Sequence, residues 1–205
     1  FFKKPESLEG SFCWVLCAFG AGFWWPQEFS FWGGVVAFIL TIALIESSFT
    51  MAFNDELTGL PARRAMNEFL LKVGRRYTVA MVDVDHFKKV NDTHGHDVGD
   101  QVLRMVATCL RRVSGGGRAY RYGGEEFVIV LPNTTLEQAM KRAEAIRLAV
   151  VKTPFNVQGE PVTISISIGV AELQPQESPN DLCARADKIL DSAKEAGRNQ
   201  VMASK

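Results

Sequence analysis

Two long apolar segments open the chain, and shorter alternating segments follow them. Residues 10–27 hold no charged side chain, and residues 29–45 form a second uncharged run. At about 1.5 Å of rise per helical residue, each run would extend roughly 25–27 Å, close to the ~30 Å hydrocarbon thickness of a bilayer. We therefore predict two transmembrane helices, at about 11–27 and 29–46, within a membrane region over residues 1–46.

Aromatic and basic residues indicate how these helices would lie in a membrane. Indole rings favour the membrane interface, and four tryptophans lie toward the segment ends: Trp14, Trp24, Trp25 and Trp32. Lys3 and Lys4 precede the first predicted span, and Arg63 follows the second. The connection around Gln27 has neither Lys nor Arg. By the positive-inside rule, both ends of the membrane region and everything after residue 46 would be cytoplasmic.

A buried helical hairpin or a signal peptide would also be apolar. No cleavage-like site precedes a mature domain and a second apolar segment follows the first, which argues against a signal peptide. Residues 47–53 separate the second predicted span from the next domain, and we expect them to form a short linker helix. Because the chain starts at Phe1 rather than Met, we also expect it to be part of a longer protein.

Residues 54–205 alternate shorter helical and strand patterns. An apolar run over 78–82 is suited to a buried strand, and apolar residues recur at helical spacing over 98–113. The other predicted elements are strands 118–122 and 126–131 around a Gly-Gly turn, helices 135–151 and 179–196 with Gly197 at the end of the second, and a β-rich segment at 161–172. Helices before and after a hairpin indicate an α/β fold, specifically an α+β sandwich with a mainly antiparallel central sheet and flanking helices.

Charge and cysteine content exclude several classes of function. The chain has 23 basic and 23 acidic residues, and the two Lys and four Glu of residues 1–53 leave the remainder with a charge of only +2. This balance lacks the basic field of a duplex-DNA-binding protein, and we expect no nucleic-acid polymer as a partner. The four cysteines form no CxxC pair, and no His lies at metal-ligand spacing from them, which argues against a zinc site.

Carboxylates at the end of the predicted strand 78–82 form the first candidate site. Asp83 and Asp85 would point to one side of an extended chain, and Val84 would point to the other. A buried carboxylate is costly unless a cation or hydrogen-bond donors compensate it. An Asp that only caps the following turn would give the same local pattern, so these residues alone leave both interpretations open.

Two further carboxylates follow the glycines of the predicted hairpin turn. By the period of two, Glu125 and Glu126 would point to opposite faces, so only one would face a site shared with Asp83. Because Gly123 and Gly124 lack side chains, a nucleotide could approach the backbone closely. Mg²⁺ is usually held by one or two carboxylates together with substrate phosphates. The pattern therefore indicates metal-assisted phosphoryl chemistry, with a merely solvated pair of glutamates as the alternative.

Five separated motifs follow one another within residues 53–202. They cover residues 55–64, 83–92, 95–100, 121–127 and 194–199, and the fourth contains the signature Gly123, Gly124, Glu125, Glu126 and Phe127. In this order the motifs resemble the GGDEF-domain diguanylate cyclase family, in the GGEEF form of its signature. A single signature would be weak, whereas five motifs in the expected order make the resemblance specific.

The resemblance implies both a fold and a reaction. The fold would be related to polymerase palm and class III nucleotide cyclase domains, over residues 54–205. The enzyme would be a nucleotidyltransferase of bacterial signal transduction that condenses two GTP to cyclic di-GMP with release of two pyrophosphates. Each half-site would hold one GTP and two Mg²⁺ ions, with Mn²⁺ as an alternative, so that catalysis needs a homodimer. Together with membrane contact through residues 10–46, this predicts a multi-pass protein of the cell inner membrane with a cytoplasmic catalytic domain.

The resemblance also assigns roles around the signature. Asp83 would bind Mg²⁺ through its carboxylate and Val84 through its backbone carbonyl. Glu125 would be the other metal ligand and would help to deprotonate the attacking 3′-hydroxyl, while Glu126 matches a required position without a defined role. In-line displacement at a phosphoryl group held between two metal ions is the physical basis of this assignment.

Other residues match the family's nucleotide pocket. Asn91 and Asp100 match the guanine-reading positions, where a carboxylate can accept from the guanine N1–H and exocyclic amine. The remaining substrate-binding positions are Phe87, Lys88, Leu103, Lys194 and Arg198. From the residues alone, Asn91 fits a turn, Asp100 fits a helix N-terminus, and the two apolar residues fit a core. Lys194 and Arg198 would share a helical face if the last helix continues through Gly197, and would otherwise be a cationic helix end.

One departure from the family concerns residues 114–117. Many members carry Arg-x-x-Asp there, where the product binds and inhibits, whereas this chain has Ser-Gly-Gly-Gly. We therefore predict no feedback inhibition through that site, and Asp100 favours a guanine-only product. A catalytically silent nucleotide-binding module and a dimerising membrane scaffold are the alternative functions. The silent module would be expected to have lost Asp83, Glu125 or the glycines, and none is lost.

Overall fold

The computed structural model describes residues 14–17, 29–112 and 116–203, without the side chains of residues 29–30 and 46–52. The chain divides into two compact units, Phe1–Phe53 and Asn54–Lys205. The first predicted membrane span, residues 11–27, lies outside the described residues except for a short helical stretch at 14–17. The loop at 114–117 is described only at its last two positions.

The first unit contains α2 (Phe29–Phe53), which also covers the predicted linker over 47–53. Within the described part of the chain, no helix is both long and apolar enough to cross a membrane. This finding does not support the predicted membrane span over 29–46. The segment is nevertheless helical, as part of α2.

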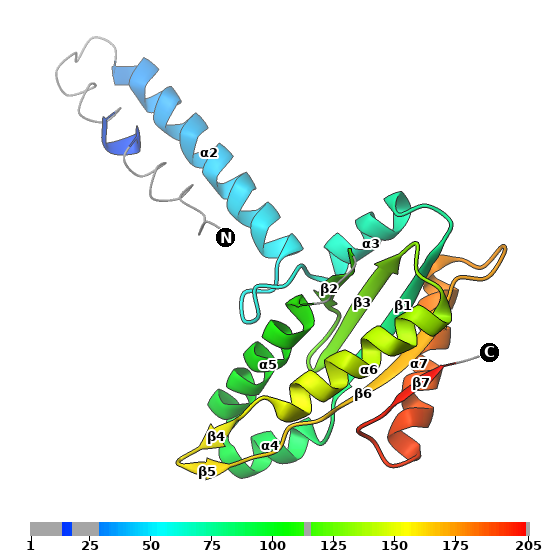
Figure 1. Cartoon of the computed structure of the whole chain (residues 1–205). Coiled ribbons are helices and arrows are strands. Elements are labelled where there is room, and N and C mark those ends of the chain that lie inside the picture. Colours follow the sequence, from blue (N-terminus) through cyan, green and yellow to red (C-terminus); the bar gives the residue numbers. More distant parts are fainter. Residues whose placement is uncertain (1–13, 18–28, 113–115, 204–205) are drawn as a thin grey trace. The chain divides into compact units, whose positions relative to one another are not determined.

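The second unit is built around a five-stranded sheet in the order β2-β3-β1-β6-β7 (Figure 1). The strands are β1 (Tyr77–Val84), β2 (Arg118–Arg121), β3 (Glu126–Pro132), β6 (Ile166–Glu172) and β7 (Val201–Ala203). All neighbouring strands are antiparallel except β6 and β7, which are parallel. The predicted mainly antiparallel central sheet is confirmed, and the last pair makes it a mixed sheet.

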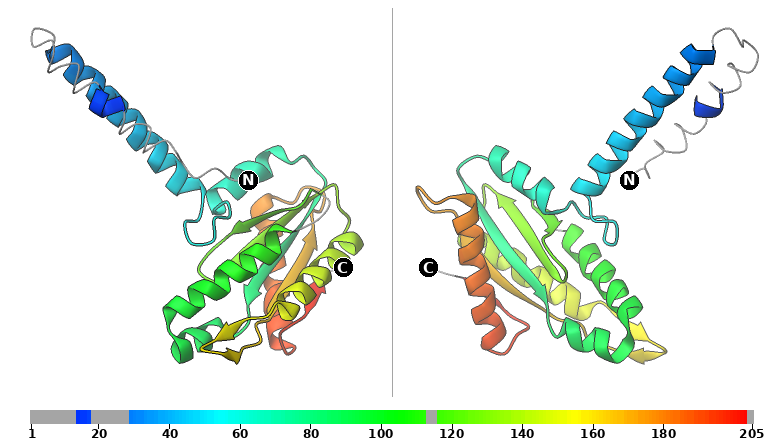
Figure 2. Two further views of the ribbon diagram at one scale, coloured as in Figure 1. Left: turned by 60° about the vertical axis from the view of Figure 1, so that its left-hand side comes forward. Right: turned by 180° about the vertical axis from the view of Figure 1, so that it is seen from behind.

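Helices cover both faces of this sheet (Figures 1 and 2). One face packs against α5 (His96–Arg111) and α6 (Leu136–Lys152), and the other against α3 (Arg63–Lys72) and α7 (Pro179–Glu195). The short helix α4 (Phe87–His94) connects β1 to α5, and a small hairpin of β4 (Asn156–Val157) and β5 (Glu160–Pro161) follows α6. The layers confirm the predicted α+β sandwich.

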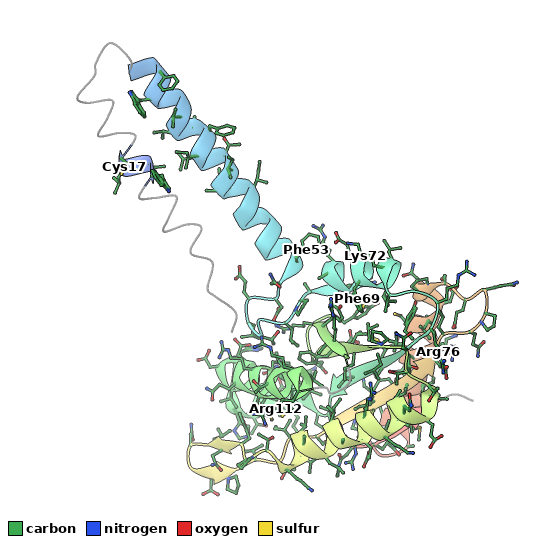
Figure 3. The ribbon with its side chains drawn as sticks, turned by 45° about the horizontal axis from the view of Figure 1, so that its top comes forward. Cys17, Phe53, Phe69, Lys72, Arg76 and Arg112 are labelled. Carbon is green, nitrogen blue, oxygen red and sulfur yellow. The ribbon has the colours of Figure 1, made fainter. Side chains whose placement is uncertain are left out.

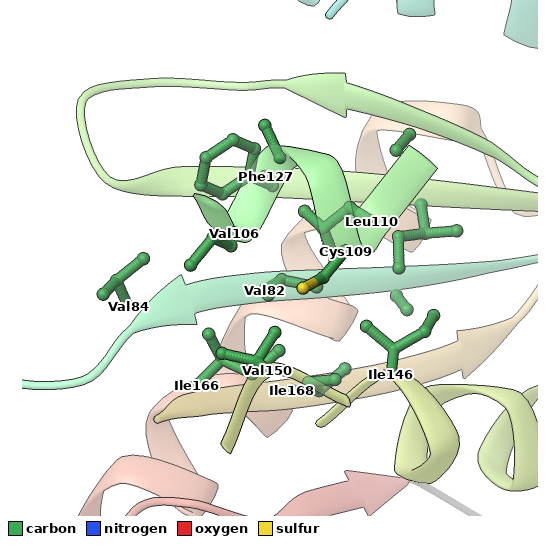
Figure 4. Close-up of a cluster of buried hydrophobic side chains, with 14 of the residues drawn as sticks. Val82, Val84, Val106, Cys109, Leu110, Phe127, Ile146, Val150, Ile166 and Ile168 are labelled. Atoms are coloured by element: carbon green, nitrogen blue, oxygen red, sulfur yellow. The ribbon is translucent and has the colours of Figure 1, made fainter. Parts of the chain in front are cut away.

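The central strand β1 is buried on both sides, and its alternation positions the candidate site. Val82 and Val84 belong to the core beneath α5 and α6, which Figure 4 shows from close by. Val79 and Met81 belong to the second core, beneath α3 and α7. Asp83 continues this second series, so it lies on the α7 side of the sheet at the end of β1. The strand register sets it opposite Glu126 of β3 and Ser167 of β6.

The helix α3, which periodicity did not predict, packs on the edge strand β2. The ring of Phe69 lies 6.2 Å from that of Tyr120, and the guanidinium of Arg118 lies 4.4 Å above the Phe69 ring. Figure 3 labels Phe69 and Lys72 on α3. Periodicity also missed α4 and β7, because both are short and depend on tertiary contacts rather than on an amphipathic pattern of their own. The predicted helices over 98–113, 135–151 and 179–196 are confirmed as α5, α6 and α7.

Candidate active site

Asp83 is the most perturbed acid of the site. It is 5% exposed, and its Oδ2 lies 3.0 Å from Nζ of Lys194 in the last turn of α7. Burial raises the pKa of Asp83 to about 6, even though the Lys194 ammonium lowers it. Burial lowers the pKa of Lys194, but the pairing with Asp83 outweighs it and the net shift is upward. The carboxylate therefore lies where additional positive charge would stabilise it.

Both glutamates of the signature act on Asp83. Each raises the pKa of Asp83, and Glu125 has the larger effect of the two. The N–H of Val84 donates to the carbonyl of Glu125 at 3.4 Å, and burial raises the pKa of Glu125. The prediction that only one glutamate would face the site rested on strand alternation. Glu125 lies in the turn ahead of β3, where the two-residue period of a strand does not apply.

Arg121 holds the turn that contains the two glycines. Its guanidinium donates to the carbonyls of Gly123 and Gly124 at 3.3 and 2.7 Å. It also donates to both carboxylate oxygens of Asp55, at 2.8 and 2.9 Å. The N–H of Gly123 closes the turn on the carbonyl of Glu126 at 3.3 Å. One side chain thus fixes the Gly-Gly turn to the loop that precedes α3.

The loop that precedes α3 is itself ordered by Asp55. Its Oδ2 accepts from the N–H and the hydroxyl of Thr58 at 2.7 and 2.5 Å, and Arg111 of α5 donates to the carbonyl of Thr58 at 2.5 Å. Burial raises the pKa of Asp55, but the hydrogen bonds from Thr58 and Arg121 outweigh it and the net shift is downward. The sequence motifs included Asp55 and Arg121, yet nothing in their spacing indicated that they pair across the fold.

The acidic side chains alone do not form a ready-made metal centre. Among the described residues, no group of three or more His, Cys, Asp or Glu is arranged to hold a metal ion. The donors at the end of β1 nevertheless fit Mg²⁺, because this ion is usually held by one or two carboxylates and completes its shell with phosphates and water. Asp83, Glu125 and the carbonyl of Val84 would be the protein ligands. Burial and the nearby glutamates raise the pKa of Asp83, and a cation at its carboxylate would favour the ionised form.

A second group of predicted residues meets where α4 packs on α5. Phe87 and Leu103 are buried in the core, at 8% and 3% exposure. The Asn91 side chain lies against Gly99, next to Asp100, and its Oδ1 is buried without a hydrogen-bond partner. A Cβ at position 99 would lie only 1.9 Å from that oxygen. Asn91 therefore fits here because residue 99 is a glycine.

Two predicted contacts of the triphosphate are not on one helix. α7 ends at Glu195, and Gly197 has a φ of +117°, so the helix does not continue through Gly197 and Lys194 and Arg198 do not share a helical face. Gly197 ends the helix as predicted, because its N–H bonds back to the carbonyl of Lys194 while that of Arg198 bonds to Ala193. Arg198 and Lys88 are exposed.

Comparison with known proteins identifies relatives of the chain. The family model described as "Diguanylate cyclase, GGDEF domain" matches residues 52–200. Diguanylate cyclase DgcP of Pseudomonas aeruginosa is 40% identical over 165 residues, which cover 77% of this chain and 25% of DgcP. Response regulator PleD of Caulobacter vibrioides is 41% identical over 172 residues, which cover 77% of this chain and 37% of PleD. The chain thus spans about a quarter to a third of the length of these curated relatives.

Solved structures share the fold. The coiled coil and GGDEF domain of DgcB from Caulobacter crescentus, in complex with c-di-GMP, matches with a TM-score of 0.78 at 32% identity. The match covers 87% of this chain and 99% of that one. The active GGEEF domain of a diguanylate cyclase from Vibrio cholerae matches with a TM-score of 0.61 at 36% identity, over 69% of this chain and 90% of that one.

Proposed function

The chain belongs to the diguanylate cyclase GGDEF-domain family, and we propose that it condenses two GTP into cyclic di-GMP with release of two pyrophosphates. The cluster at the end of β1 carries the proposal, because Asp83, Glu125 and Glu126 lie there beside Lys194. Carboxylates and an ammonium next to a Gly-Gly turn suit a triphosphate with its metal ions. The similarity to DgcB, which was solved with c-di-GMP, supports the same reaction.

Each of the two steps is a displacement at phosphorus. The 3′-oxygen of one GTP attacks the α-phosphorus of the other, the bond to pyrophosphate breaks, and the hydroxyl proton passes to a base. We assign the base to Glu125, because burial raises its pKa and so makes it a better proton acceptor near neutral pH. Mg²⁺ held by Asp83, Glu125 and the Val84 carbonyl would neutralise the phosphate and leaving-group charge, and Mn²⁺ would serve as an alternative.

The remaining residues bind and orient the nucleotide in this proposal. The Lys194 ammonium, 3.0 Å from Asp83, is within reach of a phosphate held at the same carboxylate. Arg198 is a second phosphate contact. Asn91 and Asp100 read the guanine, since they lie together where α4 packs on α5. Three further residues line the pocket: Phe87, Lys88 and Leu103.

A homodimer is part of the proposal. Each domain has one such site, whereas the reaction joins two GTP molecules, so two sites must face each other. GTP and Mg²⁺ are both found in the cytoplasm, and the location of the catalytic domain there, at an inner membrane, stays a prediction. A catalytically silent binder is the second candidate, and it differs from the enzyme in binding GTP without forming product.

The test is to incubate the 205-residue chain with GTP and Mg²⁺ and to measure cyclic di-GMP by mass spectrometry and pyrophosphate by a coupled assay. We expect two pyrophosphates for each cyclic di-GMP, and a Glu125→Gln variant that melts like the wild type but loses at least about 100-fold in rate. GTP binding without product from the wild type would instead establish the silent binder. A Glu125→Gln variant with wild-type turnover would exclude Glu125 as the base.

A further inference from the structure

Both carboxylate oxygens of Asp85, the second aspartate of the β1 motif, accept hydrogen bonds from within the protein. Asp85 is 5% exposed, and its Oδ1 accepts from the hydroxyl of Ser167 at 2.6 Å. Its Oδ2 accepts from the hydroxyl of Ser165 at 2.7 Å and from the main-chain N–H of Asn199 at 3.0 Å. The carboxylate therefore joins the end of β1 to β6 and to the segment that follows α7.

The segment that Asp85 holds has an unusual backbone. Gly197, Arg198 and Asn199 have successive φ angles of +117°, +64° and +45°. Only glycine adopts such angles freely, so Arg198 and Asn199 hold a conformation that residues with side chains disfavour. A conformation of this kind persists only where the surrounding structure holds it. We call residues 197–199 the closing turn.

Other groups hold the closing turn from its remaining sides. Arg147 of α6 donates to the side-chain oxygen of Asn199 at 2.6 Å. The side-chain amide of Gln200 donates to the carbonyl of Ala193 in α7 at 2.7 Å, and the carbonyl of Gln200 accepts from the N–H of Ile168 in β6 at 3.0 Å. Of these tethers, the bond to Asp85 is the one that fixes the closing turn to the same strand end that carries Asp83.

We propose that Asp85 is a positioning residue for the phosphate chain of the substrate. It acts as a hydrogen-bond acceptor that holds the closing turn in its left-handed conformation, and thereby places Arg198 and the end of α7 with Lys194. The inference rests on the proposed function, because it takes Arg198 and Lys194 as the phosphate contacts. It requires an acceptor oxygen at position 85 rather than a metal-binding charge, which distinguishes Asp85 from Asp83.

Two substitutions separate the acceptor from the charge. Asp85→Ala removes the acceptor, whereas Asp85→Asn keeps one oxygen for the N–H of Asn199, and its NH₂ can donate to the Ser167 hydroxyl oxygen. The probes are 3′-deoxy-GTP, which lacks the attacking hydroxyl and cannot react, and GMP, which lacks the β- and γ-phosphates. With Mg²⁺ present, we expect Asp85→Ala to weaken the binding of 3′-deoxy-GTP at least about 10-fold and the binding of GMP less than about 2-fold. We expect Asp85→Asn to bind both probes within about 3-fold of the wild-type affinity.

A double substitution tests whether Asp85 acts through Arg198. The combination Asp85→Ala with Arg198→Ala should bind 3′-deoxy-GTP no more than about 3-fold more weakly than the weaker single variant, because both remove the same contact. Equal weakening of 3′-deoxy-GTP and GMP would overturn the proposal, since it would indicate general damage to the site. An Asp85→Asn variant as weak as Asp85→Ala would overturn it as well, because the charge would then matter.

A second variant keeps the test valid if Asp85→Ala does not fold. Arg147→Met removes the donor to Asn199 from the opposite side of the closing turn and leaves β1 intact. Arg147→Met should weaken the binding of 3′-deoxy-GTP about 3-fold and leave the binding of GMP unchanged. An unchanged affinity for both probes would contradict the proposal that the conformation of the closing turn determines phosphate binding. Ser165→Ala is the matched control, because it removes a neighbouring bond to the same oxygen without touching residue 199. A wild type that binds no GTP would refute the proposed function instead, so the two failures are distinguishable.

Discussion

Two buried aspartates stand two residues apart at the end of β1, and their surroundings are opposite. Asp83 lies among Lys194, Glu125 and Glu126, and burial raises its pKa to about 6. Asp85 accepts three hydrogen bonds, from two serines and from the main chain of Asn199. The first region has negative charge that the protein does not fully compensate, as expected of a site for a cation or a phosphate-bound metal. The second region is complete without a ligand and serves as scaffold.

Asn91, which we propose to contact the guanine, and Asp55 show the same contrast on a smaller scale. Asn91 keeps a buried oxygen without a partner, pressed against Gly99. Asp55, by comparison, is fully engaged by Thr58 and Arg121. Unpartnered polar groups therefore mark the places where we expect the substrate, and fully partnered groups mark the supports that hold those places in position.

Among the supporting contacts, the largest effect is expected from removing the support of the Gly-Gly turn. Arg121→Ala would leave the carbonyls of Gly123 and Gly124 and the carboxylate of Asp55 without their shared donor. We expect turnover to fall about 10- to 100-fold, with a loss of about 1–3 kcal/mol of unfolding free energy. Steady-state kinetics and urea unfolding measure the two quantities. Arg111→Ala is the control, since it removes a hydrogen bond to Thr58 in the same loop without affecting the Gly-Gly turn. A larger loss of turnover in Arg111→Ala than in Arg121→Ala would contradict the role assigned to Arg121.

A smaller effect is expected from a substitution at Gly99, where we propose that the guanine of GTP binds. Gly99→Ala places a methyl group within 1.9 Å of the Asn91 oxygen and should displace that side chain. We expect the KM for GTP to rise about 10-fold, with kcat at saturating GTP changed less than about 3-fold. In an Asn91→Ala background the same Gly99→Ala change should have little further effect on KM, because the crowded oxygen is absent. An unchanged KM with a lowered melting temperature would make Gly99 a packing residue only.

A still smaller effect concerns pH, and it can be measured in the metal-free chain. The folded state raises the pKa of Asp83 from its ordinary value of 3.8 to about 6, so folding favours the protonated carboxyl. The resulting stabilisation is fully present below about pH 4 and is lost as pH rises through about 6. Asp83→Asn should therefore gain on the order of 1–2 kcal/mol relative to the wild type between pH 4 and pH 7.5. Urea unfolding with a chelator present measures the difference; one that does not change with pH would contradict the raised pKa.

The last prediction is that added cyclic di-GMP does not inhibit the enzyme through residues 114–117. Residues 114–117 lack the Arg-x-x-Asp pair at which many family members bind product. Added cyclic di-GMP at micromolar concentration should leave the initial rate of GTP conversion within about 2-fold of its starting value. Ser114→Arg combined with Gly117→Asp supplies the pair, and inhibition that appears only in this variant would support the prediction. Non-competitive inhibition of the wild type that depends on this loop would refute it.

Much of the catalytic unit could be predicted from the sequence, because its elements are long and strongly patterned. The buried run that became β1, the amphipathic α5, α6 and α7, and the Gly-Gly turn all followed from local periodicity. The placement of Asp83 beside the signature followed from motif order. The pairings of Arg121 with Asp55 and of Asp85 with Asn199 span 66 and 114 residues, and no local pattern reveals such contacts.

Two local patterns stop at the ends of their elements. Strand alternation does not reach Glu125, which lies in a turn, and helical spacing does not reach Arg198, which lies beyond the end of α7. Both patterns hold only inside an element, and functional residues concentrate just outside element ends. The apolar character of residues 29–46 did predict a helix, and the membrane-spanning assignment went beyond what helical periodicity supports.

The most direct test applies the same substitution to both aspartates. Asp83→Asn and Asp85→Asn remove one charge each, two residues apart on one strand end, and each chain is assayed for cyclic di-GMP at saturating GTP and Mg²⁺. If the charge of Asp83 takes part in catalysis and Asp85 acts only as a hydrogen-bond acceptor, Asp83→Asn should lose at least about 100-fold in turnover. Asp85→Asn should then keep a third or more of the wild-type rate. Comparable losses in both variants, or substantial turnover in Asp83→Asn, would contradict this assignment.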